Sequence, residues 1–165
     1  GRDGPAPWHC SSRSDVLTFH EVFIDGQWSN ATGWMWSGFA NTAVGSSLRI
    51  LHMNYGIRIV NPIASSSFVP SFLNIHDLEL EGFKTRALSV EAGYEFRITG
   101  SDINNLTGSN GNTDDYAVAC YADAAGSMTR GLMISNTRIG DSRKSGLYSE
   151  GRGTQPDDGQ FFTTS

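Results

Sequence analysis

Two glutamates occupy equivalent positions in two copies of a repeated sequence motif of apolar residues. Residues 73 to 91 align without a gap with residues 132 to 150, which makes Glu91 equivalent to Glu150, and Tyr121 falls near that position between them. If each repeat is one coil of stacked strands, two coils separate the glutamates by about 9.6 Å. Inverting glycosidases hold their carboxyl pair about 6.5–9.5 Å apart, with water in between. The glutamates are therefore a candidate acid and base, with Tyr121 placed to hold a sugar ring. The alternative is a charged surface ladder.

A second set of equivalent positions lies one residue before the last apolar residue of the motif, and it contains Phe23, Asn54, Glu79, Asp102 and Arg138. Glu79 and Asp102 would be one coil apart, roughly 4.8 Å, so that the two acids share a proton or a cation. This spacing suits a retaining hydrolase. With Arg138 removing a proton, it also suits a calcium-dependent lyase whose carboxylates hold the metal. The alternative is a salt-bridged ladder of Asp102 against Arg138.

Aromatic residues supply the other half of a possible sugar site, because the apolar face of a sugar packs against an aromatic ring. Trp34 and Trp36 point to the same face if their segment is extended. Tyr121 and Tyr148 fall near neighbouring positions and form a candidate surface platform. For the two tryptophans the alternative is that they plug an open end of the fold or pack against a partner chain.

The repeated apolar motif from which these equivalent positions are counted predicts short strands. Its first two apolar residues are two apart, as on one face of a strand, and a step of three then requires a corner before a second strand. Five copies occur, the last two degraded: Leu17, Phe19, Val22, Ile24; Leu48, Ile50, Met53, Tyr55; Leu73, Ile75, Leu78, Leu80; Phe96, Ile98, Ser101, Ile103; and Leu132, Ile134, Thr137, Ile139. The second corner position holds Glu21, His52, Asp77, Gly100 and Asn136.

A further apolar segment follows in four of the five repeats, seen in Ile57 with Ile59, Leu88 with Val90, Val118 with Cys120, and Leu147. The sequence thus predicts an all-β fold, a parallel β-helix of about five coils with three short strands in each coil. We expect the solenoid to cover residues 17–150. An irregular opening segment (1–16) and tail (151–165) flank it, and insertions fall at 27–47, 60–72 and 104–115.

Composition narrows the function. The 165 residues carry a net charge of -5 with scattered Lys and Arg, so nucleic acid is not an expected partner. No apolar run is long enough to span a membrane, and membrane insertion is not expected. Two cysteines give no disulfide framework, and no spacing suggests zinc, so we expect free thiols and no cofactor. The chain begins without Met, and we expect a processed product or a piece of a longer protein.

Stacked coils with the motif L-x-I-x-x-x-x-[IL], corner Asp, Gly or Asn, and long polar insertions resemble the right-handed β-helix of bacteriophage tailspikes and, more distantly, of pectate lyases. The resemblance covers about residues 17 to 150 and is one of architecture. It implies a homotrimer on a virion tail spike or fibre, or a secreted protein, that binds and cleaves polysaccharide of the host surface.

We therefore expect a polysaccharide depolymerase, a glycoside hydrolase before a lyase. The assigned residues are Glu91, Glu150, Glu79 and Asp102 for catalysis and Tyr121, Tyr148, Trp34, Trp36 and Arg138 for substrate binding. Two alternatives stay open: a glycan receptor-binding module without cleavage, and a structural trimeric stalk. The shortness of the chain, with some five coils, raises the weight of both alternatives, and the two columns of acids keep the enzyme in front.

Overall fold

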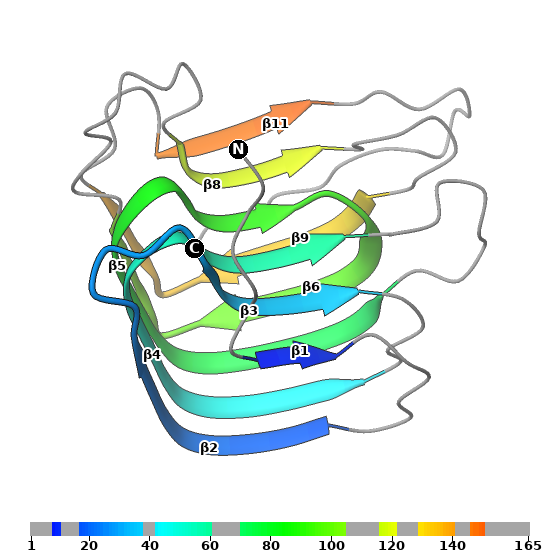
Figure 1. Ribbon diagram of the computed structural model, residues 1–165. Helices are drawn as coiled ribbons and strands as arrows, with labels where there is room; N and C mark the ends of the chain where they lie inside the picture. Colours follow the sequence, from blue (N-terminus) through cyan, green and yellow to red (C-terminus); the bar gives the residue numbers. More distant parts are fainter. Residues whose placement is uncertain are drawn as a thin grey trace.

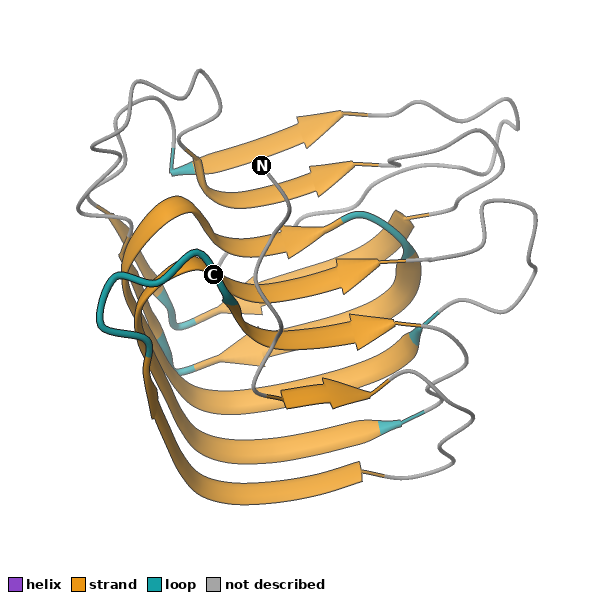
Figure 2. Ribbon diagram, viewed as in Figure 1, coloured by secondary structure: helices purple, strands orange, loops and turns teal. Residues whose placement is uncertain are grey.

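A computed structural model of the chain describes residues 8–10, 17–37, 42–60, 70–104, 116–121, 129–140 and 146–150. This part of the chain contains strands and connecting turns and no helix (Figure 2). None of its segments is therefore a helix long and apolar enough to cross a membrane. Its strands are β1 (Trp8–Cys10), β2 (Leu17–Asp25), β3 (Thr32–Ser37), β4 (Ala43–Val60), β5 (Ser71–Val90), β6 (Gly93–Thr99), β7 (Asp102–Asn104), β8 (Tyr116–Tyr121), β9 (Thr129–Ser135), β10 (Arg138–Gly140) and β11 (Leu147–Glu150).

All pairings among these strands are parallel, and they form three ladders. The first joins the opening segments of β2, β4 and β5 to β6 and β9. The second joins later segments of β2, β4 and β5 to β7 and β10. The third runs from β1 and β3 through the ends of β4 and β5 to β8 and β11. Figure 1 shows the strands stacked in one direction, with β4 and β5 bending through successive ladders. The prediction of an all-β chain of parallel strands is confirmed.

Each repeat of the sequence crosses the three ladders in the same order. The repeats span residues 17–37, 42–60, 71–90, 93–121 and 129–150, and are called the first to fifth repeats below. Between the first and second ladders the chain turns a corner at a residue with positive φ in every repeat. These residues are Glu21 (52°), Ser47 (54°), Asp77 (58°), Gly100 (60°) and Asn136 (48°). Four of the five predicted corner residues are therefore correct, and Ser47 stands where His52 was predicted.

The second repeat begins at Ala43, not at the predicted Leu48. Leu17 pairs with Ala43, and Leu48 pairs with Val22 on the second ladder. Small residues replace the expected Leu and Ile because the ring of Phe19 fills the space above them: a Cβ added to Gly45 would lie 1.8 Å from Phe19 Cε2. Of the four apolar residues that were aligned with the first repeat, Leu48 and Ile50 lie on the second ladder, Met53 follows at the next corner, and Tyr55 pairs with Thr32 at the start of the third ladder.

The core is formed by the inward residues of the three ladders. Leu48, Ile50, Leu78, Leu80 and Ile103 are fully buried on the second ladder. The third ladder adds two inward columns. The first contains the fully buried Trp34, Ile57, Leu88 and Val118 and the partly buried Leu147, and the second contains the fully buried Trp36, Ile59, Val90 and Cys120. Trp34 and Trp36 thus belong to the third strand of the first repeat, within the segment 27–47 that was predicted to be an insertion. The predicted insertions at 60–72 and 104–115 and the tail fall largely or wholly outside the described residues.

Cys120 offers a chemical probe of this core. It is free and buried, as predicted, and burial raises the pKa of its thiol to about 12. Since only the thiolate is nucleophilic, we expect iodoacetamide at pH 8 to modify Cys120 about a thousandfold more slowly in the folded protein than in urea. Peptide mass mapping distinguishes Cys120 from Cys10. Equal rates in the two states would show that the third ladder is open at this position.

Candidate functional site

The outward side chains of the second ladder form a column across all five repeats. Pairing in register places Phe23 beside Arg49, Arg49 beside Glu79, Glu79 beside Asp102, and Asp102 beside Arg138. The predicted neighbours Glu79 and Asp102 therefore lie on adjacent rungs. Asn54 does not belong to this column, because the second repeat begins five residues earlier than predicted, and Arg49 takes its place.

Each acid of the column is paired with an arginine of a neighbouring repeat, Glu79 with Arg49 of the preceding repeat and Asp102 with Arg138 of the following one. Arg49 Nη2 lies 2.8 Å from Glu79 Oε1, and both side chains are about half exposed. Arg138 Nη1 lies 3.5 Å from Asp102 Oδ2. Asp102 Oδ1 also accepts a hydrogen bond of 2.6 Å from Asn104 Nδ2. Along the column, two adjacent acids, Glu79 and Asp102, are therefore flanked by Arg49 on one side and Arg138 on the other. Both carboxylates accept hydrogen bonds or ion pairs near the surface.

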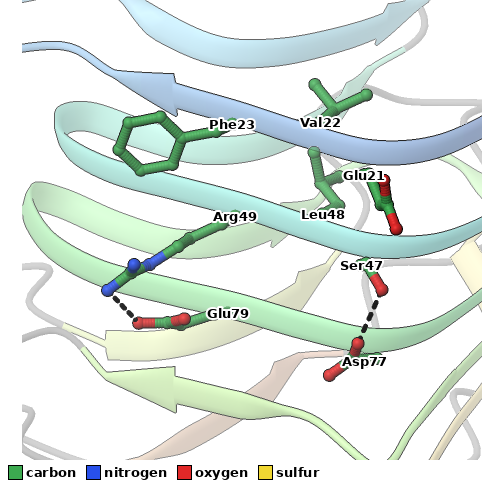
Figure 3. Close-up of a pocket in the computed structure, with 8 residues that line it drawn as sticks. All are labelled: Glu21, Val22, Phe23, Ser47, Leu48, Arg49, Asp77 and Glu79. Atoms are coloured by element: carbon green, nitrogen blue, oxygen red, sulfur yellow. Dashed lines mark hydrogen bonds and ion pairs between the residues drawn. The ribbon is translucent and has the colours of Figure 1, made fainter.

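A shallow hollow of about 410 Å³ opens beside the first rungs of this column. It is lined by Glu21, Val22, Phe23, Ser47, Leu48, Arg49, Asp77 and Glu79. Figure 3 shows the ring of Phe23 and the Arg49–Glu79 pair along one side, with the Ser47–Asp77 hydrogen bond of 2.7 Å toward the corner. The hollow therefore combines an apolar ring with charged and hydroxyl groups.

Phe23 is the unusual residue of the hollow. It is 60% exposed, more than any other large apolar side chain among the described residues. The guanidinium carbon of Arg49 lies 5.7 Å from the centre of its ring, within the range of a cation–π contact. Arg49 thus contacts both the aromatic ring and Glu79. The sequence placed Phe23 in the column without assigning it a role, and it missed Arg49.

Glu91 has the predicted backbone register and a buried side chain. Val90 pairs with Cys120, and Tyr121 pairs with Glu150, so Glu91, Tyr121 and Glu150 follow one another on the third ladder. The side chains of Tyr121 and Glu150 lie outside the described part of the structure.

The Glu91 side chain is only 1% exposed and is bound by Arg58 at two points. Arg58 Nε lies 2.8 Å from Glu91 Oε1, and Arg58 Nη2 lies 3.0 Å from Oε2. The Ser89 hydroxyl donates a further hydrogen bond of 2.8 Å to Oε1. Arg86, also buried, donates through Nη1 to Ser89 Oγ at 3.1 Å. Such a bidentate, hydrogen-bonded carboxylate is suited to holding the outside of the third ladder together.

Trp34 and Trp36 face the interior. Both are fully buried, and their rings stack with centres 5.8 Å apart. Phe19 meets Trp34 edge-on at 4.9 Å, and Phe96 meets Trp36 at 6.4 Å. In this arrangement neither indole presents a face to a ligand, and both belong to the hydrophobic core.

Tyr148 lies on the third ladder opposite Ala119, and its ring stacks on that of Tyr116 at 4.4 Å with an angle of 17°. Both tyrosines are partly exposed. The sequence predicted Tyr148 as part of a platform and did not predict Tyr116 as its partner.

No group of three or more His, Cys, Asp or Glu side chains in the described residues is arranged to hold a metal ion. Comparison of the chain with models of protein families, with curated proteins and with solved structures finds no match.

Proposed function

We propose that the chain is a segment of a tailspike-like, right-handed parallel β-helix whose second ladder binds a polysaccharide of the host cell surface. Three parallel ladders crossed in the same order by five successive repeats support the helical architecture. Connections between parallel strands are right-handed in about 98% of known cases, which supports the proposed hand.

The observation that carries the proposal is the exposed ring of Phe23 beside the paired charges of Arg49 and Glu79. A sugar ring has an apolar face that packs on an aromatic ring, while its hydroxyls donate to carboxylates and accept from guanidinium groups. The column continues this polar lining to Asp102 and Arg138 on the following repeats. It offers successive contacts to a linear chain of sugars.

Depolymerisation at Glu79 and Asp102 is the second candidate function. One observation favours it: the two acids are on adjacent rungs, about 4.8 Å apart, close to the about 5–5.5 Å between the carboxyls of retaining glycosidases. Binding is better supported, because each acid has its own arginine partner and neither is buried. A calcium-dependent lyase would use the same two carboxylates.

The proposed homotrimer and its place on a virion or outside the cell follow from the tailspike resemblance. One surface feature supports self-association: Val44, Phe72 and Met133 are large apolar residues, each about 40% exposed, on the outside of the first ladder. Phe72 also packs edge-on against Tyr94 at 5.6 Å. This face lies on a different ladder from the proposed glycan column.

The test of the proposed function is binding of capsular and O-antigen polysaccharides, measured by isothermal titration calorimetry. For the glycan that binds, Phe23→Ala is expected to weaken affinity about tenfold, the effect of losing about 1.4 kcal/mol of stacking. Phe72→Ala is the matched control, because Phe72 is exposed on the first ladder, away from the proposed glycan column, and when compared in the same oligomeric state it should bind like the wild type. Equal affinities for both variants would contradict the proposed site.

Cleavage is followed in the same mixtures by release of reducing ends, and an unsaturated-sugar absorbance would identify a lyase. Hydrolysis that is lost in Glu79→Gln and Asp102→Asn, with binding retained, would establish the depolymerase. Binding without cleavage by the wild type would establish the receptor-binding function.

A further inference from the structure

Trp28 is held in an unusual conformation at a second corner of the fold, where the chain leaves the second ladder. Gln27 and Trp28 have φ values of 49° and 65°. A bulky aromatic residue rarely adopts this left-handed conformation, and such a residue keeps it only when its surroundings enforce it. Here the Trp28 amide donates to the His52 carbonyl at 2.7 Å, and the Gln27 amide donates to Asp25 Oδ1 at 2.9 Å.

The indole of Trp28 lies on the imidazole of His52. Their ring centres are 4.5 Å apart, with an angle of 36° between the planes. His52 Nδ1 in turn lies 3.2 Å from Asp25 Oδ1, which fixes the imidazole. The hydrogen bond from the Gln27 amide, and then the contact with His52, lower the pKa of the Asp25 carboxyl. The imidazole of His52 thus covers one face of the indole, and Trp28 remains 43% exposed.

Gly82 of the third repeat leaves the space that the rings of Trp28 and His52 occupy. It lies opposite His52, between the pairs Leu51 with Glu81 and Met53 with Phe83. Its φ is +72°, and a Cβ added there would lie 2.8 Å from His52 Cδ2 and 3.1 Å from Trp28 Cη2. A side chain at this position would displace the imidazole or the indole.

Polar groups lie on the same two segments, two residues beyond the contact of Trp28 with Gly82. Lys84 Nζ donates a hydrogen bond of 2.7 Å to Asn30 Oδ1, and both groups are exposed. The Asn30 amide nitrogen and the remaining Lys84 protons are donors suited to hydroxyl oxygens. A backed aromatic face with adjacent donors is the composition expected of a sugar subsite.

We propose that Trp28 forms a second carbohydrate subsite, which takes the apolar face of another sugar of the polysaccharide bound at Phe23. Phe23 and Asp25 both point outward on β2, about 6.6 Å apart, and Trp28 follows at the corner. The glycan then runs along β2 from the hollow toward the corner, and not only across the repeats. This inference rests on the proposed function and adds the direction of the ligand.

A single exposed tryptophan is common on protein surfaces and carries little by itself. Three independent features distinguish Trp28: the enforced left-handed backbone, the imidazole fixed by Asp25 behind the ring, and the glycine that makes room for both. Together they fix the orientation of the indole before any ligand arrives. Preorganisation of this kind lowers the entropic cost of binding.

The test uses oligosaccharides of increasing length from the glycan that the wild type binds, again by calorimetry. Trp28→Ala is expected to lower the affinity for long oligosaccharides about tenfold and to leave the shortest bound fragment unaffected. Gly82→Ala retains Trp28 but places a methyl group in the space beside its ring. It is also expected to lower the affinity for long oligosaccharides. Phe23→Ala should weaken binding at every length.

The outcomes separate the two proposals. If Trp28→Ala and Gly82→Ala bind all lengths like the wild type while Phe23→Ala does not, the Trp28 subsite is wrong and the hollow stands. If the wild type binds no surface glycan, the proposed function and the subsite both fall. Circular dichroism verifies folding, and Trp28→Phe, which keeps an aromatic face, replaces Trp28→Ala if the latter fails to fold. In the Nε1–H spectrum of protein labelled in its tryptophans, the peak lost in Trp28→Phe is expected to shift on binding of the long oligosaccharide.

Discussion

Replacing Glu91 with Leu is expected to lower the free energy of unfolding by about 3–5 kcal/mol, because the substitution removes the buried carboxylate that pairs with Arg58. Arg58 approaches both carboxylate oxygens, and its own side chain is only 22% exposed. The Ser89 hydroxyl loses its acceptor as well. Urea denaturation followed by circular dichroism measures the change.

Two further variants identify the cause. Glu79→Gln removes one partner of an exposed pair with Arg49, and it should cost no more than about 1 kcal/mol. The double variant Arg58→Met with Glu91→Leu removes both buried charges, and it should recover most of the loss because buried pairs are replaceable by apolar groups. A loss for Glu91→Leu as small as that for Glu79→Gln would contradict the buried ion pair.

The same residue separates structure from catalysis. Glu91→Gln weakens the ion pair with Arg58, so the variant is expected to be destabilised in either case. If Glu91 is also the acid predicted from its register, the folded variant no longer cleaves a polysaccharide that the wild type cleaves. If the ion pair is its only role, the folded variant retains cleavage. The register predicted from the sequence is compatible with both roles, because register does not determine which side chain covers a carboxylate.

Much of the fold could be predicted from one well-formed repeat. Leu73, Ile75, Leu78 and Leu80 alternate and then shift by one residue, a pattern that indicates a strand bent at a corner. The first, fourth and fifth repeats follow the same positions, and pairing in the structure agrees with them. The neighbouring rungs of Glu79 and Asp102 follow directly from this alignment.

The second repeat could not be predicted from its own residues. Ala43 and Gly45 occupy core positions where other repeats have larger residues, because Phe19 of the first repeat fills the shared space. A pattern of large apolar residues therefore selects Leu48 as the start, and the error moves Arg49 out of the column. Complementary volumes in adjacent repeats are a property of packing between repeats and leave no periodic signal within one repeat.

Replacing Trp36 with Ala is expected to cost about 3–5 kcal/mol of folding free energy, the range for large aromatic side chains in a core. Trp36 is fully buried between the stacked ring of Trp34 and the edge of Phe96. Its column continues through Ile59, Val90 and Cys120, so the cavity opens inside the third ladder. The midpoint of urea denaturation should fall accordingly.

Trp28→Ala is the matched control, because it removes the same side chain from an exposed corner. We expect a loss of about 1 kcal/mol or less for Trp28→Ala, in the range of most surface substitutions. The two variants therefore test a structural role for Trp36 and a binding role for Trp28, two tryptophans that are eight residues apart in the sequence. A Trp36→Ala protein with the stability of the wild type but weakened glycan binding would return Trp36 to the ligand-binding role predicted from the sequence. A destabilised Trp36→Ala beside a stable Trp28→Ala that binds long oligosaccharides weakly places the aromatic contact at the corner.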